Sequence, residues 1–443
     1  MNNYKTIALA ALAGTMLTPC AAMARTHHQQ GPSVEQQLKA AQGQIAALQA
    51  QLDALQARMD QSAATQTQVA ADTQAASQKA DQALAQATTA QSAAAAAQTK
   101  ADAASDKAGK PAIADAVKWA ADTKVSGRMY FNMSSVSADN AAGTNVEKDG
   151  GFQIKRFYVS VDHTFNKTFS GDITTDVKQV GGVGQTLFIK KAYLQAKLNK
   201  AAVVRLGSAD MPWIPYAEGI YGYRHIDNTI TDLDHFANSA DWGVHVLGDF
   251  ANGAVSYQVS AINGAGYRAP QFTKTIDLEG RLSVDYKGIQ AAVGGYTGKL
   301  GKDVQGATTY HTASRFDALL GYKGKAGNVG YSIGGEYFYA KNWNNVTTLA
   351  QDAAEGYSVF ASIQPAPKWS LFGRYDWIKP SKDLNPLQKD HYFNAGIQYS
   401  PAKIVDLALV YKRDSADNLL TIGNLSSGQA TRNEIGIYGQ FRW

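Results

Sequence analysis

Hydrophobic and polar residues alternate along the chain from about residue 123 onward. Near the start of this region, Val125, Met129 and Phe131 alternate with Arg128 and Tyr130. A period of two predicts β-strands with one apolar and one polar face. The pattern recurs to the last residue and predicts sixteen strands, which begin near residues 123, 152, 168, 186, 201, 239, 254, 277, 289, 314, 328, 355, 367, 389, 404 and 431.

The connections between these strands alternate in length. Short turns are expected at 166–167, 199–200, 252–253, 287–288, 324–327, 365–367 and 400–403, and long loops at 136–151, 179–185, 208–238, 264–276, 299–313, 341–354, 379–388 and 414–430. An even-stranded barrel whose termini lie on the same side gives this alternation. A soluble β-sandwich does not require it. The fold class predicted for residues 123–443 is therefore all-β, a transmembrane β-barrel of about 16 antiparallel strands.

Two further features fit such a barrel. The final residues alternate and close on an aromatic pair, Phe441 and Trp443, an ending typical of outer-membrane barrels. About sixteen strands enclose a water-filled lumen, whereas an eight-stranded barrel is filled by its own side chains. The longest loop, from Ser208 to Ala240, is rich in Pro and aromatic residues, so we expect it to fold inward and narrow the lumen. Its candidate constriction residues are Asp210, Trp213, Arg224 and His225.

A different periodicity precedes the barrel. Val34, Leu38, Ala41, Ile45 and Leu48 follow one another at alternating spacings of four and three. This heptad seam predicts an α-helical coiled coil over residues 25–110, in the periplasm, followed by a linker at 111–122. A disordered Ala/Gln-rich linker is the alternative. As a helix the segment would reach about 110 Å, which makes peptidoglycan a candidate partner.

The first 24 residues resemble a secretory signal peptide. Lys5 precedes an apolar stretch at 7–18, and Ala22-Met23-Ala24 forms an A-x-A cleavage site. A membrane anchor and a lipoprotein signal at Cys20 are the alternatives. Because Cys20 is the one cysteine, cleavage after Ala24 would exclude thiol chemistry and a Cys-ligated metal.

Composition narrows the function classes further. The 443 residues include 42 Lys/Arg and 37 Asp/Glu, a net charge of +5 without the clustered basic face that nucleic-acid binding requires. Mean hydropathy is −0.28, and outside the N-terminus no apolar run approaches the ~20 residues of a membrane helix. The eight histidines lack metal-ligand spacing, and no nucleophile–base triad is evident. We therefore expect neither an enzyme nor a cofactor.

Three motifs carry a resemblance to a known family. The stretch Gln153-Ile-Lys-Arg-Phe-Tyr-Val-Ser-Val-Asp-His-Thr-Phe, the stretch Phe188-Ile-Lys-Lys-Ala-Tyr-Leu-Gln-Ala-Lys-Leu and Val203-Val-Arg-Leu-Gly resemble strands of the phosphate-selective porin O and P family. The resemblance implies a sixteen-stranded trimeric channel, often selective for anions such as phosphate. One departure matters. Where that family usually has Gly-Gln-Phe-Lys-Glu-Pro-Phe, this chain has Gly207-Ser-Ala-Asp-Met-Pro-Trp213, so an acidic residue, Asp210, occupies the position of a lysine.

Strand parity identifies the side chains expected to line the lumen. The cationic candidates, expected to form an anion-attracting stripe, are Arg128, Arg156, Lys178, Lys191, Lys197 and Arg205. A similar number of acidic residues share the polar faces, so a wall of solvated ion pairs without selectivity is the alternative. The leading hypothesis is an outer-membrane porin for passive diffusion of small hydrophilic solutes, with an anion preference, assembled as a homotrimer in lipid. A structural tether between outer membrane and cell wall is the runner-up, and an outer-membrane enzyme is third.

Overall fold

The computed structural model describes residues 117–180, 184–417 and 420–443, together with scattered helical positions between 43 and 100. The chain divides into two units, residues 1–109 and 110–443. The predicted signal peptide (1–24), most of the predicted coiled coil (25–110) and the first part of the linker lie outside the described residues, so they stay predictions. Among the described residues, none of the helices is both long and apolar enough to cross a bilayer.

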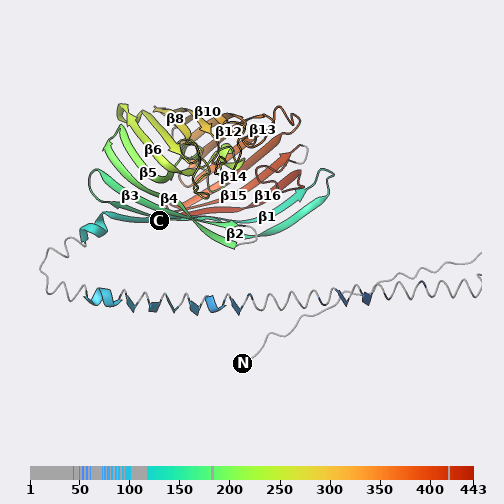
Figure 1. Cartoon of the computed structure of the whole chain (residues 1–443), viewed down its shortest axis with the longest axis horizontal. Helices are drawn as coiled ribbons and strands as arrows, with labels where there is room; N and C mark the ends of the chain where they lie inside the picture. The colour runs from blue at the N-terminus through green and yellow to red at the C-terminus, as the bar shows by residue number, and fades with distance from the viewer. Residues whose placement is uncertain are drawn as a thin grey trace, which may run out of the picture. The chain divides into compact units, whose positions relative to one another are not determined.

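Sixteen strands close into one antiparallel barrel (Figure 1). Each strand pairs with its sequence neighbour, and β1 pairs with β16 to complete the ring. The strands are β1 (Thr123–Asp139), β2 (Asn145–Thr164), β3 (Phe169–Val180), β4 (Gly184–Asn199), β5 (Ala202–Asp210), β6 (Ala240–Phe250), β7 (Val255–Ile262), β8 (Asp277–Tyr286), β9 (Ile289–Gly298), β10 (Ala313–Ala326), β11 (Val329–Lys341), β12 (Ala353–Ala366), β13 (Trp369–Lys379), β14 (Asp390–Ala402), β15 (Val405–Ala416) and β16 (Thr431–Arg442). The predicted sixteen-stranded barrel is confirmed.

The exception among the predicted strand starts is β2. The other fifteen strands begin within two residues of the predicted position, whereas β2 begins at Asn145 rather than near 152. The long loop predicted at 136–151 is therefore wrong, because most of it continues the β1–β2 hairpin. Both faces of β2 are exposed between Asn145 and Gln153 apart from a half-buried Glu147, so this part has no apolar face and no clear alternation. Backbone pairing with β1 holds it, while pairing with β3 begins only at Phe157.

Side-chain alternation separates the two faces of the wall. On β10, Phe316 and Leu320 are exposed on the outer face, while Arg315, Asp317 and Leu319 are buried on the inner face. The same division runs around the ring, so apolar side chains cover the outside and polar ones face the lumen. Polar and charged side chains are therefore concentrated in the lumen.

The last residue helps to close the barrel. Trp443 exchanges backbone hydrogen bonds with Gly127 of β1, and its indole lies over that glycine. A Cβ atom at Gly127 would lie 2.0 Å from Trp443 Cζ2, which is far inside contact distance. The seam between the first and last strands therefore requires a residue without a side chain at 127.

Candidate constriction and lumen

The segment between β5 and β6, which we call loop 3 (residues 211–239), folds into the ring of strands (Figure 1). It contains two helices, α3 (Ile214–Tyr221) and α4 (Ile230–Leu233). Pro215 lies in the first turn of α3, where proline is tolerated, and Gly222 ends the helix at a φ of 80°. The segment is placed inside the barrel by its contacts with inward-facing residues of β2, β8, β10, β11, β13, β14 and β15.

One end of loop 3 is fixed by Trp213. This side chain is fully buried against Ala217, Ala292 and Leu319. Its indole Nε1 donates to Glu336 of β11 at 2.7 Å, and its backbone N–H donates to Glu279 of β8 at 3.1 Å. Trp213 therefore packs loop 3 onto the wall and does not itself face an open passage.

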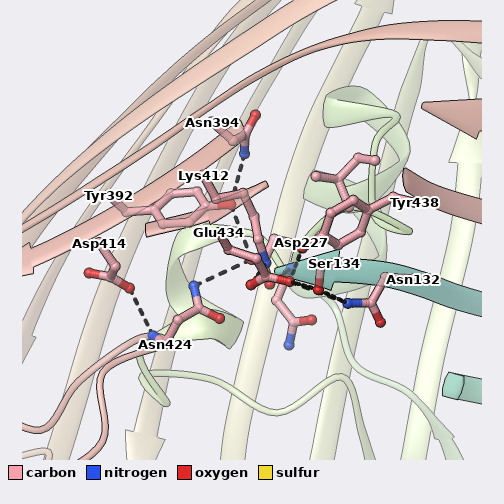
Figure 2. Close-up of polar contacts among 12 residues, drawn as sticks. Asn132, Ser134, Asp227, Tyr392, Asn394, Lys412, Asp414, Asn424, Glu434 and Tyr438 are labelled. Atoms are coloured by element: carbon pink, nitrogen blue, oxygen red, sulfur yellow. Dashed lines mark hydrogen bonds and ion pairs between the residues drawn. The ribbon is translucent and has the colours of Figure 1, made fainter. Parts of the chain in front are cut away.

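The middle of loop 3 is held by Asp227, which contacts β14 and β15 (Figure 2). The Asp227 carboxylate accepts from Lys412 Nζ at 3.2 Å, from Tyr392 Oη at 3.1 Å and from Asn424 Nδ2 at 3.3 Å. Burial acts to raise the pKa of Asp227, but Lys412 and Lys155 outweigh it and hold the pKa well below its usual value. The carboxylate is therefore ionised, and it stays paired with Lys412.

The Lys412 ammonium joins this contact to the barrel seam. It also contacts Glu434 of β16 at 3.0 Å. Glu434 in turn accepts from Ser134 at 2.8 Å and from Asn132 at 3.2 Å, both on β1. Figure 2 shows these side chains converging from β1, β15, β16 and loop 3. We call Asp227, Lys412 and Glu434 the loop-3 clamp.

Two arginines on other strands add backbone contacts to the same loop. Arg315 of β10 donates to the carbonyl of Phe236 at 2.6 Å, and Arg374 of β13 donates to the carbonyl of Asn228. Loop 3 is thus attached on several sides of the lumen, as a constriction requires.

Two β-bulges change which cations reach the lumen. In the β1–β2 ladder, Tyr130 pairs with Arg156 and Phe131 pairs with Ile154, so Lys155 is an extra residue. A bulge of this kind redirects the side chain of the extra residue. Lys155 consequently turns inward and donates to the carbonyl of Ile226 in loop 3.

The second bulge repeats this arrangement on β4. Thr174 pairs with Lys191 and Thr175 pairs with Ile189, which leaves Lys190 as the extra residue. Lys190 lies over the ring of Tyr158 at 5.1 Å. Both bulges fall within the Ile-Lys-Arg and Ile-Lys-Lys motifs. Strict alternation missed Lys155 and Lys190 because it allows only one residue of each pair to face inward.

The six predicted lumen cations differ in what they contact. Arg156 forms an ion pair with Asp176 at 2.6 Å, and Lys191 forms one with Asp210 at 3.4 Å. Arg128 donates to Tyr130 Oη at 3.1 Å. Thus two of these cations are largely neutralised by carboxylates, whereas Arg128 keeps its charge available.

The remaining three predicted cations lie away from this level. Arg205 donates to Gln195 and stacks on Tyr193, near the turn between β4 and β5. Lys197 lies closer still to that turn. Lys178 lies near the C-terminal end of β3. The structure therefore does not bring the six predicted residues together as one stripe.

A cavity of about 530 Å³ lies beside β1, β2, β4 and loop 3. Its lining contains seven Lys/Arg residues and two acidic residues, Asp210 and Glu218; the cations are Lys124, Arg128, Lys190, Lys191, Arg224, Lys403 and Arg442. Arg224 comes from loop 3 and pairs with Glu218. We call Arg128, Lys190, Lys191 and Arg224 the cationic wall. Neither Arg128 nor Lys190 has a carboxylate within ion-pair distance in the described part of the chain.

A second loop, residues 263–276 between β7 and β8, also contacts the lumen wall. Tyr267 donates to Asp176 Oδ2 at 2.5 Å, and Arg268 lies 3.7 Å from the same oxygen. The Asp176 carboxylate thus contacts Arg156, Arg268 and Tyr267 at the same time. The sequence predicted a long loop here but gave no pattern that would turn these two residues inward.

His225, a predicted constriction residue, is almost fully buried beside the cationic wall. Burial lowers its pKa to about 3, since nearby Asp406 only partly offsets the lost hydration. The imidazole is therefore neutral and adds no charge to the lumen at neutral pH. Within the described ranges, no three His, Cys, Asp or Glu side chains are grouped to hold a metal ion.

Comparison with known proteins bears on the fold. No model of a known protein family matches the sequence, and no curated protein matches it. Solved structures do match. OprB of Pseudomonas putida has a TM-score of 0.54 at 11% identity, covering 73% of this chain and 94% of that one. The anion-selective porin of Comamonas acidovorans has a TM-score of 0.50 at 13% identity, covering 72% and 99%. The outer-membrane channel DcaP of Acinetobacter baumannii has a TM-score of 0.50 at 14% identity, covering 72% and 97%.

At these identities the likeness establishes a shared fold. The barrel of this chain is built like the barrels of outer-membrane porins. The narrower resemblance to the phosphate-selective porin O and P family stays a prediction.

Proposed function

We propose that this protein is an outer-membrane porin for passive diffusion of small hydrophilic solutes, with a preference for anions. The observation that carries the proposal is the lumen cavity lined by seven cations and two carboxylates beside an inward-folded loop. A confined passage with one sign of charge raises the local concentration of the opposite ion. The apolar outer face of the barrel suits the hydrocarbon of a membrane.

The proposed anion preference can be tested at two residues of the cationic wall. Arg128 and Lys190 lack ion-pair partners among the described residues, so their charges act on a passing ion. By Coulomb's law, one unit charge at ~6 Å in water is worth about 0.7 kcal/mol before screening by salt. Removing two such charges changes the free energy of an anion by about 1.4 kcal/mol, or roughly tenfold in partitioning.

The experiment is a reversal-potential measurement in planar bilayers across a gradient of dilute potassium chloride. The double variant Arg128→Gln/Lys190→Gln should lower the ratio of anion to cation permeability by up to roughly tenfold. The control, Lys167→Gln/Lys200→Gln, removes the same charge from two exposed turns outside the lumen. A wild-type protein that is not anion-selective, or a double variant indistinguishable from the control, would overturn the proposal.

The assembly is part of the same proposal. We infer a homotrimer in outer-membrane lipid, with the segment at 25–110 forming a periplasmic coiled coil that approaches peptidoglycan. Deleting residues 25–110 should leave conducting barrels but reduce co-sedimentation with cell-wall material. A channel that fails to conduct at all would instead favour the tether, in which the barrel serves only as an anchor.

A further inference from the structure

A second lumen cavity of about 580 Å³ lies across from the cationic wall. Its lining comes from strands β9 to β16 and from the end of α3. Most of its polar side chains are neutral hydroxyls and amides, and its charged members are Lys323, Lys325, Asp406 and Arg442. We call six of the neutral side chains the neutral wall: Gln290, Ser332, Ser362, Ser370, Gln398 and Gln440. The volume lies in the range of cavities that bind small molecules.

The neutral wall is a chain of hydrogen-bonding groups. Ser332 and Ser362 share a hydrogen bond of 2.8 Å between their hydroxyls, and Gln398 donates to Ser400 at 3.2 Å. Gln440 donates to Asp406 at 2.7 Å. Hydroxyls and amides both donate and accept. A surface of this kind matches the hydroxyl groups of a solute, and unlike a charged wall it needs no ion to be desolvated.

Aromatic rings from loop 3 border the same cavity. Tyr223 stacks on Phe372 with ring centroids 4.1 Å apart, and Tyr221 packs edge-on against Phe360 at 5.4 Å. The negative face of such a ring attracts polarised C–H groups. An aromatic ring beside neutral hydrogen-bonding groups therefore suits a solute with a C–H face and hydroxyls at its edge.

The neutral cavity borders a third cavity, which contains three residues of the cationic wall. Gly219, Gly222, Gln440 and Arg442 line both the neutral cavity and the cavity beside His225 that includes Arg128, Lys190 and Arg224. A solute lying on the neutral wall can thus place a charged end toward the cationic wall. Neither wall alone would select for a molecule that carries both features.

We propose that the lumen binds polyhydroxylated organic anions, such as sugar acids or sugar phosphates, with the charged end on the cationic wall and the hydroxyls on the neutral wall. This proposal rests on the proposed function, because the charged end needs an anion-preferring lumen. The chemistry shared by the two solute types is an anionic head on a polyhydroxylated chain.

The test compares block of chloride current by gluconate, by glucose 6-phosphate and by hexanoate, a six-carbon acid without hydroxyls. In the wild type, gluconate should block at roughly tenfold lower concentration than hexanoate, because its hydroxyls form hydrogen bonds with the neutral wall that hexanoate cannot form. Comparison of gluconate with glucose 6-phosphate then shows whether a carboxylate or a phosphate head is preferred. Equal block by gluconate and hexanoate would overturn the proposal.

Two variants separate this proposal from the proposed function. Ser362→Ala/Ser370→Ala should weaken block by gluconate roughly tenfold while leaving block by hexanoate and chloride selectivity unchanged. Arg128→Gln/Lys190→Gln should weaken both blockers together and lower chloride selectivity. The control Ser135→Ala/Ser427→Ala removes two exposed hydroxyls outside the lumen. If the Ser362/Ser370 variant behaves like this control, the hydroxyl preference is refuted while anion selectivity stands.

Discussion

The loop-3 clamp predicts that Asp227 fixes the width of the passage. Asp227→Ala removes a buried carboxylate that accepts from Lys412, Tyr392 and Asn424 at 3.1 to 3.3 Å. Breaking a buried ion pair costs about 3–5 kcal/mol when the other charge is left unpaired. Lys412 keeps Glu434 at 3.0 Å, so we expect the lower value, about 3 kcal/mol. That corresponds to a more than hundredfold rise in the population of the state in which this part of loop 3 is detached.

The assay is single-channel recording in planar bilayers. Asp227→Ala should raise open-channel noise and mean conductance, and Asp227→Asn, which keeps an acceptor oxygen, should give an intermediate result. The control is Glu355→Ala, which breaks a half-exposed pair with Lys382 outside the lumen and should leave the current unchanged. If Asp227→Ala gives the noise and conductance of this control, the clamp does not hold loop 3.

Three further predictions address the barrel and its loop. Trp213→Ala should lower the temperature at which the barrel unfolds, measured as the loss of the fast-migrating folded band in gels. The variant opens a cavity that lowers the free energy of unfolding by about 3–5 kcal/mol, and it leaves buried Glu336 without its indole donor. Gly127→Val should reduce the yield of that folded form, since a Cβ there displaces Trp443; a normal yield would contradict the seam. Burial of His225 should make the docking of loop 3 weaker in acid. The imidazole has a pKa near 6.5 when it is exposed to water and about 3 when it is buried, so protonation favours the undocked loop. The free energy of docking should therefore fall as the pH falls below 6.5, by about 2 kcal/mol at pH 5. The variant His225→Gln should remove this component from the conductance recorded between pH 7 and 5.

The strands could be predicted because their physical cause is local. A wall with an apolar outside and a wet inside imposes a period of two on the sequence, and turns interrupt it. The pattern did not predict the part of β2 from Asn145 to Gln153, because both of its faces are largely exposed. Local pattern carries no information about a strand that has no buried face.

The site was harder to predict, because its contacts join residues far apart in sequence. Lys412 and Asp227 are 185 positions apart, and nothing in either neighbourhood marks them as partners. Trp213 lies in loop 3, but its aromatic character alone does not indicate whether it faces the passage or the wall. Lys155 and Lys190 were missed for a different reason, because a bulge breaks the alternation from which inward residues were deduced.

The two bulges also bear on how such a channel could diversify. A residue added to or deleted from an ordinary strand moves every later side chain to the opposite face, which would turn apolar groups into the lumen. Lys155 and Lys190 are already extra residues, and the ladder resumes its register on either side of them. Loss of either lysine would shorten the strand by one position yet leave its neighbours oriented as before. Deletion at either position would therefore lower the positive charge of the passage in a single step, with the apolar outer face left intact.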